Sequence, residues 1–311
     1  MTPLAEGVLE GDVRSIAKAL TLVEGDPETR KGLVGELFPH TGNAHIIGMT
    51  GPPGVGKSTI VDAMITVLRK GGQQVGVIAV DPTSPFTGGA ILGDRIRMVE
   101  HSTDPGVFVR SMGSRGSLGG LGPATADAVT VLDAAGFDSI IVETVGAGQA
   151  EVDIVRTSHT TLVVEMPGMG DDVQVMKAGL MEIGDIFIVN KADRPDAGRL
   201  VVQLESLLSL TGRSGWVPPV VKTVGHDPAT LTDLMDAIRR HREYLAGAGV
   251  DSRARVIADH WMRLLIEEQA LDRVIGGMGE EEYSDMVGRV VSKELDPYSA
   301  VDDLFKRYFK A

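Results

Sequence analysis

One nine-residue segment has the residue types and the spacing of a phosphate-binding loop: Gly51-Pro52-Pro53-Gly54-Val55-Gly56-Lys57-Ser58-Thr59. An apolar run precedes it and a helical pattern follows it, so the loop joins a predicted strand to a predicted helix. Glycines in such a turn let backbone amides converge on phosphate oxygens, and the helix N-terminus adds its positive end. We therefore predict a nucleotide-phosphate site, with Lys57 at the β- and γ-phosphates and the Ser58 hydroxyl on Mg²⁺.

A second motif, Asn190-Lys191-Ala192-Asp193, ends a short apolar run well downstream of this loop. Guanine presents N1–H and N2–H₂ donors that one carboxylate, Asp193, can accept together, whereas adenine presents the wrong pattern. Asn190 is expected to brace the loop, and Lys191 to lie along the base plane. Backbone N–H groups of Thr223, Val224 and Gly225 are predicted to reach the guanine O6. The two motifs together predict binding of GTP and GDP.

Three acidic residues are predicted to complete the metal end of this site: Asp81, Asp94 and Glu143. Asp81 and Glu143 close predicted strands, and Asp94 follows a segment that contains glycines. A hard cation that bridges phosphates prefers carboxylate and water oxygens. We therefore predict that these residues hold Mg²⁺ together with Ser58, although each one alone also fits a helix cap or a solvated turn.

The predicted reaction is in-line attack of water on the γ-phosphoryl group of GTP. Lys57, the loop amides and the Mg²⁺ held by residues such as Glu143 are expected to neutralise the developing charge. Gln149 is the candidate for orienting the water. The chain shows no obvious arginine to assist, and the four candidates are each interpreted as surface residues: Arg95, Arg97, Arg110 and Arg115. A low intrinsic turnover that a partner raises is therefore expected.

The residues with chemical roles stand among elements that predict an α/β fold. Short apolar runs alternate with helical stretches, which indicates a mostly parallel central sheet covered by helices on both faces. Ligands of such sheets bind beyond the carboxyl ends of the strands, where most of the motif residues fall. The predicted strands are residues 44–50, 75–80, 107–110, 139–143, 161–165, 185–190 and 217–223.

Helical segments are predicted on both sides of the sheet region. Residues 1–43 are expected to form an N-terminal helical extension, residues 44–228 the P-loop nucleotide-binding domain, and residues 229–311 a C-terminal helical region. Helices that follow a completed sheet need a surface on which to bury their apolar stripe. The C-terminal region is accordingly interpreted either as a cap on the domain or as a dimerisation arm.

Composition restricts the partners and the location of the chain. The 311 residues carry a formal net charge of −13, which disfavours nucleic acid and an anionic membrane as partners. The chain has no cysteine, so disulfides, thiolate catalysis and a cysteine-built zinc site are excluded. Because there is no long apolar run and no secretory signal pattern, we expect a cytoplasmic protein without a membrane span.

The third nucleotide motif departs from that of ordinary GTPases, which have Asp-x-x-Gly where this chain has Glu143-Thr-Val-Gly146. This substitution resembles the P-loop GTPases that act as chaperones of metal centres and cofactors. Within that group, three strings resemble the methylmalonyl-CoA mutase-associated GTPases of the MeaB and ArgK type: VDPTSPFTGGAILGDRIRM, ETVGAGQAEVD and PGMGDDVQVMKAGLMEIGD. The resemblance covers essentially the whole chain.

This resemblance implies a homodimeric GTPase that binds an adenosylcobalamin-dependent methylmalonyl-CoA mutase. Such a protein gates cofactor loading and protects or reactivates the mutase, with GTP binding and hydrolysis as the signal. The resemblance also implies Mg²⁺ and switch roles for the three acidic residues, and a mobile switch over residues 167–177 in which Lys177 responds to the partner. The chain departs mildly from the family there, since it reads Met169-Gly-Asp-Asp-Val-Gln-Val where Gly-Asp-Glu-Leu-Gln-Gly is frequent.

Other functions stay open at this level. An ATP-dependent kinase or transport ATPase would share the phosphate loop but not the Asn190–Asp193 motif. A metallochaperone for nickel or another metal would usually carry a tract rich in His or Cys, whereas the seven histidines here are scattered. A scaffold that only holds nucleotide would show no turnover. The glycine-rich residues 113–122 receive no role, and the client mutase rests on the resemblance alone.

Overall fold

A computed structural model describes residues 1–25, 27–81, 101, 103–113, 121–144, 153–168, 178–212, 215–248 and 250–308. The chain divides into two compact units, Met1–Ile257 and Ala258–Ala311. The boundaries that we predicted at residues 43 and 228 both lie inside the first unit. The N-terminal helices and the sheet therefore belong to one compact body.

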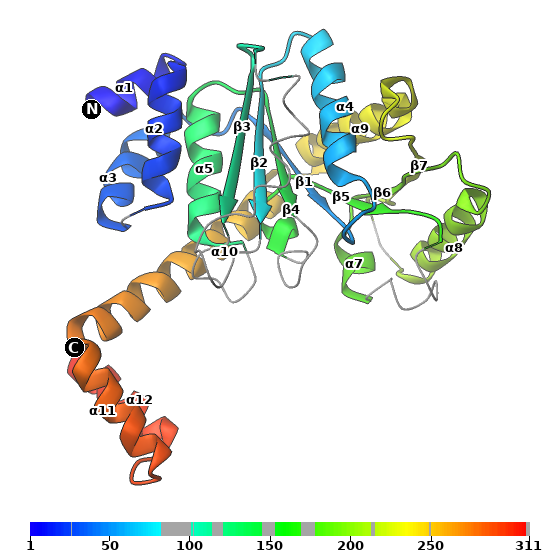
Figure 1. Ribbon diagram of the computed structural model, residues 1–311. Helices are drawn as coiled ribbons and strands as arrows, with labels where there is room; N and C mark the ends of the chain where they lie inside the picture. Colours follow the sequence, from blue (N-terminus) through cyan, green and yellow to red (C-terminus); the bar gives the residue numbers. More distant parts are fainter. Residues whose placement is uncertain are drawn as a thin grey trace. The chain divides into compact units, whose positions relative to one another are not determined.

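The first unit is built on a seven-stranded sheet in which all neighbouring strands are parallel (Figure 1). The strand order is β3-β2-β4-β1-β5-β6-β7. The predicted parallel, helix-covered sheet is confirmed, and each predicted strand is present with its ends shifted by at most three residues. The strands are β1 (His45–Thr50), β2 (Val75–Asp81), β3 (Val107–Gly113), β4 (Ser139–Thr144), β5 (Thr160–Glu165), β6 (Ile186–Val189) and β7 (Val220–Lys222).

Alternate residues of the central strands pack against different helices, which explains why these strands are apolar on both faces. On β1, Ile47 and Met49 pack in one core with α4 (Lys57–Lys70) and α9 (Thr232–Ala248). Ile46 faces the other way, into a core that α5 (Pro123–Ala134) shares with the N-terminal helices. Burying each side chain of this size stabilises the fold by about 1.5–3 kcal/mol.

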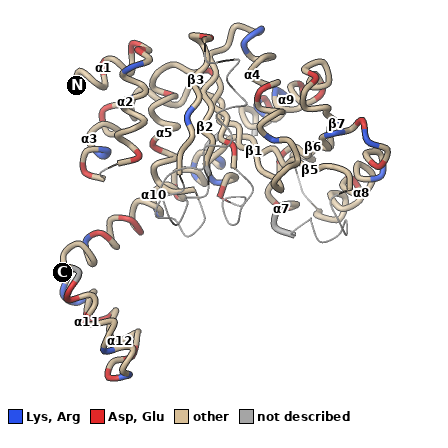
Figure 2. The backbone as a smooth tube through the Cα atoms, viewed as in Figure 1, with Lys and Arg blue, Asp and Glu red and all other residues tan. Residues whose placement is uncertain are grey.

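The other helices of the first unit surround this sheet, and most Lys, Arg, Asp and Glu residues lie on helices rather than strands (Figure 2). A third, smaller core forms where β6 meets α8. The helices are α1 (Pro3–Leu9), α2 (Val13–Val23), α3 (Pro27–Leu37), α7 (Ala178–Ile183) and α8 (Ala197–Leu210), with 3₁₀ turns η1 (Phe38–His40), η3 (Ile154–Arg156) and η4 (Pro228–Leu231).

Helix α5 fixes the N-terminal extension to the sheet. The buried side chains of Arg30 on α3 and Asp127 on α5 form an ion pair with 3.0 Å between Nε and Oδ2. The carboxylate of Asp133, also on α5, accepts hydrogen bonds from the amides of residues 42–44 at 2.7–3.1 Å. Because those amides lie immediately before β1, one carboxylate positions the strand that leads into the phosphate loop.

The second unit is helical. Helix α10 (Val250–Leu271) continues from the first unit into it, followed by a π-helical turn η5 (Asp272–Gly276), α11 (Glu280–Val291) and α12 (Pro297–Tyr308). Its small core contains Met278, Met286, Ala300 and Leu304. Over the described residues, every helix is too short or too polar to cross a membrane.

A buried chain of polar side chains connects strands and helices at the amino-terminal edge of the sheet. His45 Nε2 lies 2.9 Å from Thr160 Oγ1, which lies 2.8 Å from Nδ1 of His241 on α9. His241 Nε2 in turn lies 3.5 Å from Asp185 Oδ1. Burial lowers the pKa of His45 to about 3 and that of the neighbouring His159 to about 4, and it also lowers the pKa of His241.

These histidines are expected to make the fold sensitive to acid. The unfolded chain takes up a proton on His45 and on His159 below a pH of about 6.5, whereas the folded chain does so only near pH 3 for His45 and near pH 4 for His159. Their contribution is therefore complete above pH 6.5 and is lost as the pH falls, by about 1.4 kcal/mol per pH unit for each histidine. Urea titrations between pH 6.5 and 4.5 should show this loss in the free energy of unfolding.

The variant His45→Gln should weaken that pH dependence, because it removes one of the groups that take up a proton on unfolding. His40→Gln, at an exposed position, should leave the slope as in the wild type. Equal slopes for His45→Gln and the wild type would show that His45 does not carry the effect.

Candidate functional site

Several motif residues meet at the carboxyl edge of the sheet, beyond β1, β4 and β6. Strand β1 lies in the middle, between β4 and β5, and ends directly before the phosphate loop. Met49 of β1 is paired in register with Glu143 of β4, so the acidic residue emerges beside the loop. Strand β6 ends at Val189, directly before Asn190. Parallel strands thus bring together segments that are far apart in the sequence.

Two glycines of the loop have no room for a side chain. Gly51 has a φ of 141°, and a Cβ there would overlap the carbonyl oxygen of Val164 on β5. Gly56 has a φ of 98°, and a Cβ there would overlap Nδ2 of Asn190. The loop therefore approaches β5 and the residue after β6 more closely than any other amino acid would allow.

Lys57, the first residue of α4, is buried with its ammonium group turned back onto the loop. Its Nζ donates hydrogen bonds to the carbonyl oxygens of Gly51 at 2.7 Å and Pro52 at 3.0 Å. The fixed positive charge lies inside the loop, at the end of α4 whose free amides also favour an anion. This arrangement is suited to a phosphate group.

Ser58 and Glu143 form a buried pair next to Lys57. The Ser58 hydroxyl donates to Glu143 Oε1 at 2.7 Å, which joins the start of α4 to the end of β4. A hydroxyl and a carboxylate are the hard oxygen donors that Mg²⁺ prefers, so these residues fit that ion. In the part of the chain described, no group of three His, Asp or Glu side chains could hold a metal. Two protein oxygens suit Mg²⁺, which keeps several waters.

Asn190 holds the phosphate loop and the loop after β7 together. Its Nδ2 donates to the carbonyl oxygen of Val55 at 2.7 Å. Its Oδ1 accepts from the Thr223 hydroxyl at 3.1 Å and from the Gly225 amide at 2.9 Å. One buried amide side chain therefore fixes three segments, so that a ligand held by one segment lies at a set distance from the others.

Lys191 and Asp193 follow directly. Lys191 has a φ of 55°, uncommon for a residue with a side chain, and its Nζ donates to the Gly54 carbonyl oxygen at 2.9 Å. Asp193 is exposed, and its carboxylate makes no hydrogen bond or ion pair with the described residues. The motif thus presents an available carboxylate next to a loop that is built for phosphate.

The backbone amides of the loop after β7 form hydrogen bonds within the protein. The Thr223 amide donates to Val189 O at 3.0 Å, the Val224 amide to Thr230 Oγ1 at 3.0 Å, and the Gly225 amide to Asn190. These hydrogen bonds hold the loop in place, and the predicted contact of these amides with the guanine O6 stays a prediction. No sequence pattern pointed to Thr230, whose hydroxyl holds this turn.

Comparison with known proteins decides the family. Residues 16–279 match the sequence model described as "Methylmalonyl Co-A mutase-associated GTPase MeaB". The chain belongs to the MeaB family. The resemblance noted from the three strings is therefore confirmed.

Relatives of this MeaB family member cover nearly its whole length. A Pyrococcus horikoshii protein named as a GTPase is 50% identical over 309 residues, which is 96% of this chain and 95% of the relative. GTPase ArgK of Escherichia coli is 34% identical over 88% of this chain and 86% of its own. The mouse protein named methylmalonic aciduria type A homolog, mitochondrial, is 30% identical over 98% of this chain and 79% of its own. These names agree with a P-loop GTPase fold.

A solved structure supports the same fold for the MeaB family chain. The crystal structure of an LAO/AO transport system kinase is 25% identical and covers 99% of this chain and 97% of its own, with a TM-score of 0.72. The similarity covers residues of both units.

Some predicted site residues of this MeaB family chain lie outside the described residues, namely Asp94, Gln149 and Lys177, as do Arg95, Arg97 and Arg115. Asp81 is described through its backbone, as the last residue of β2. Arg110 is described in full: its Nε donates to Glu24 Oε1 at 2.8 Å, so it joins β3 to the N-terminal extension. Arg110 is therefore not an assisting arginine in this structure.

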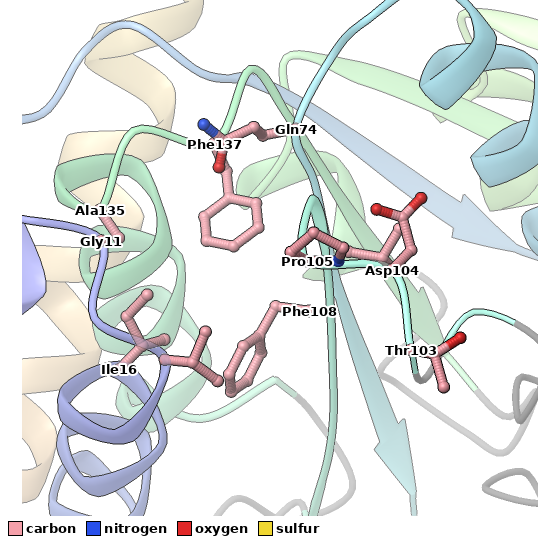
Figure 3. Close-up of a pocket in the computed structure, with 11 residues that line it drawn as sticks. Gly11, Ile16, Gln74, Thr103, Asp104, Pro105, Phe108, Ala135 and Phe137 are labelled. Atoms are coloured by element: carbon pink, nitrogen blue, oxygen red, sulfur yellow. The ribbon is translucent and has the colours of Figure 1, made fainter.

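One hollow away from the motif residues lies between α2 and β3 and has a volume of about 210 Å³ (Figure 3). The rings of Phe108 and Phe137 meet edge to face with centroids 6.4 Å apart. The carboxylate of Asp104 points away from the hollow (Figure 3). It pairs with the guanidinium group of Arg69 at 2.8 Å. Among the described residues, the lining of this hollow contains none of the phosphate-loop or Asn190–Asp193 motif residues.

Proposed function

We propose that this MeaB family chain binds GTP with Mg²⁺ and hydrolyses it to GDP and phosphate. The observation that carries the proposal is the pair of hydrogen bonds from Asn190 and Lys191 to the phosphate loop. These bonds connect the segment that leads to Asp193 to the loop that contains Lys57. A site with one end for phosphates and another for the N1–H and N2–H₂ donors of a base fits a guanine nucleotide.

The proposed roles follow from the contacts. Lys57 and the loop amides would stabilise the charge that develops on the γ-phosphate, while Ser58 and Glu143 would hold Mg²⁺. When bound, Mg²⁺ would neutralise charge on the β- and γ-phosphates. Asp81 and Asp94 are proposed as further contacts at the metal end, Gln149 as the residue that orients the water, and Lys177 as the residue that responds to a partner.

The variant Glu143→Gln is expected to lower GTP turnover by roughly 10²-fold or more and to shift its Mg²⁺ dependence to higher concentration. Glutamine keeps an oxygen that can accept from Ser58, so the fold should persist while the negative charge is lost. Phosphate release measured across a Mg²⁺ titration tests this. The exposed Glu182→Gln serves as the matched control, and identical Mg²⁺ curves for Glu143→Gln and wild type would remove Glu143 from the metal site.

The proposed partner is an adenosylcobalamin-dependent acyl-CoA mutase, namely methylmalonyl-CoA mutase. The family description and the name of the mouse relative support this choice. In this role GTP binding and hydrolysis would gate cofactor loading and would protect or reactivate the mutase. Arg110 forms an ion pair with Glu24, so it does not assist GTP hydrolysis in this structure. This supports the expectation that intrinsic hydrolysis is slow and that a partner raises its rate.

Single-turnover phosphate release with and without purified methylmalonyl-CoA mutase tests the partnership. The mutase should raise the GTP hydrolysis rate of the wild type and leave Lys57→Ala inactive. Wild-type hydrolysis that the mutase does not change would overturn the proposed regulation while leaving the GTPase proposal standing.

A homodimer is proposed through the second unit. Tyr283, Val287 and Val291 follow one another at four-residue spacing on α11, with exposed fractions of 43%, 44% and 77%. Val301 and Phe305 add an exposed pair on α12. Such stripes on a small helical unit need a covering surface, which a second copy supplies.

Val287→Asp should convert the dimer into a monomer, because it places a charge in the middle of the α11 stripe. Light scattering coupled to gel filtration measures the change. Asp285→Ala on the same exposed helix is the control that should stay dimeric. A wild-type monomer at micromolar concentration would refute the proposed arm.

A further inference from the structure

A second hollow, of about 380 Å³, opens at the amino-terminal edge of the sheet. Asp185 directly precedes β6, whereas the nucleotide motifs follow the carboxyl ends of the strands, so this hollow lies at the edge away from them. Its lining comes from the segment before β7 and from α9 and α10, within the first unit. The lining includes Asp185, Trp216, His241, Tyr244, Arg253 and Val256.

One wall of the hollow is made of aromatic rings in fixed orientations. The Trp216 ring lies 4.8 Å from that of His241 and 5.5 Å from that of Tyr244, measured between centroids. Trp216 Nε1 donates to the Asp185 carbonyl oxygen at 2.7 Å, which prevents the indole from turning. Tyr244 remains 36% exposed and Val256 46% exposed, so a ligand can reach this wall. A flat apolar group would pack well here.

Arg253 provides a polar group next to the rings. Its Nε donates to Ser158 O at 3.0 Å, and its Nη2 donates to Thr161 Oγ1 at 3.2 Å and Asp185 Oδ2 at 3.1 Å. Among the described residues its Nη1 meets no acceptor. The guanidinium is thus held rigidly by one side while the other keeps N–H groups that can bind an anion.

Arginines lie on both of the helices that line the hollow, in a chain whose net charge is −13. Within the described chain Arg240, Arg242 and Arg255 form no ion pair. Arg240 precedes Tyr244 by one helical turn, and Arg255 follows Ser252 by three residues, so both flank the lining. Arg240 and Arg255 therefore add positive charge beside the lining, which favours an anion.

We propose that this hollow binds a small carboxylic acid that carries a flat aromatic group. The carboxylate would accept charge-assisted hydrogen bonds from Arg253 Nη1, and the ring would pack against Trp216 and Tyr244. The volume falls in the range of small-molecule sites, roughly 300–1,000 Å³. This site is independent of the proposed GTPase activity, because none of its residues belongs to the nucleotide motifs.

The two tryptophans of the chain make the proposal testable by NMR. Uniform ¹⁵N labelling should give two indole N–H signals, and Trp261→Phe identifies the one that belongs to Trp216. Phenylacetate at millimolar concentration should shift the Trp216 signal in a saturable manner and leave that of Trp261 in place. Phenylacetamide, which has the same ring without the charge, should bind at least about tenfold more weakly.

Two variants on α10, each with one added charge, distinguish binding in the hollow from binding elsewhere on the surface. Val256→Asp puts a carboxylate on the lining and should weaken phenylacetate binding by about tenfold or more. Ala254→Asp adds the same charge at an exposed position outside the lining and should change the affinity by less than about threefold. Both should keep the wild-type melting temperature.

Three results would overturn the proposal. They are an unshifted Trp216 signal with phenylacetate, equal binding of phenylacetamide, and undiminished binding by a folded Val256→Asp variant.

Discussion

Replacing Lys57 with alanine is expected to abolish detectable GTP turnover and to weaken GTP binding more than GDP binding. Lys57 supplies a buried positive charge inside the phosphate loop, where its Nζ lies 2.7 Å from Gly51 O and 3.0 Å from Pro52 O. Alanine favours helix and leaves those carbonyls in place, so α4 should still start at this residue. The loss removes a charge aimed at the γ-phosphate, for which a reduction of roughly 10²–10³-fold is typical.

Phosphate release under single-turnover conditions and GTP and GDP binding by calorimetry measure these effects for Lys57→Ala. Lys70→Ala, at the exposed far end of the same helix, is the matched control and should behave as the wild type. Turnover that survives in Lys57→Ala would refute the assignment of residues 51–59 to the phosphates.

The variant Asp193→Asn should lose guanine nucleotides and gain xanthine nucleotides. The Asp193 carboxylate can accept from both N1–H and N2–H₂ of guanine, and each charge-assisted hydrogen bond contributes about 1.5–3 kcal/mol. Losing both corresponds to a decrease in GTP affinity of roughly 10²-fold or more. An asparagine amide can also donate, which suits the carbonyl at position 2 of xanthine.

Competition between GTP, XTP and ATP for the nucleotide site measures this change in Asp193→Asn. Asp196→Asn is the control, because Asp196 is an exposed carboxylate at the start of α8 whose side chain makes no capping hydrogen bond. An unchanged order of preference in Asp193→Asn would remove Asp193 from the base site.

The sheet could be predicted because its strands are buried on both faces and therefore read as continuous apolar runs. The largest errors in strand ends fall on the two edge strands, β3 and β7. Strand β3 continues to Gly113, which pairs with Asp81 of β2, although the apolar run weakens after Arg110. Strand β7 starts only at Val220, because Pro218 and Pro219 cannot donate to a ladder.

Only some of the contacts within the candidate nucleotide site could be predicted from the sequence. The two motifs could be recognised because their residue types and spacing are local. The hydrogen bond from Asn190 to Val55 joins residues 135 positions apart, and only the strand order makes it possible. The Val224 amide donates its hydrogen bond to the Thr230 hydroxyl, and no local sequence pattern indicates that bond.

The hollow at the other edge illustrates the same limit. Trp216, His241 and Arg253 come from three separate elements, and each alone fits an ordinary structural or surface position. The fold places them together through contacts with Asp185, which Trp216 meets at its carbonyl and Arg253 at its carboxylate. The sequence pattern alone could not predict that these three side chains line one hollow.

Phosphate release from GTP and from ATP, compared side by side for the wild type, decides whether this protein is a GTPase. We expect hydrolysis of GTP that requires Mg²⁺, and hydrolysis of ATP slower by roughly 10²-fold or more. Equal hydrolysis of ATP and GTP, or no hydrolysis of GTP either alone or with methylmalonyl-CoA mutase, would contradict this expectation.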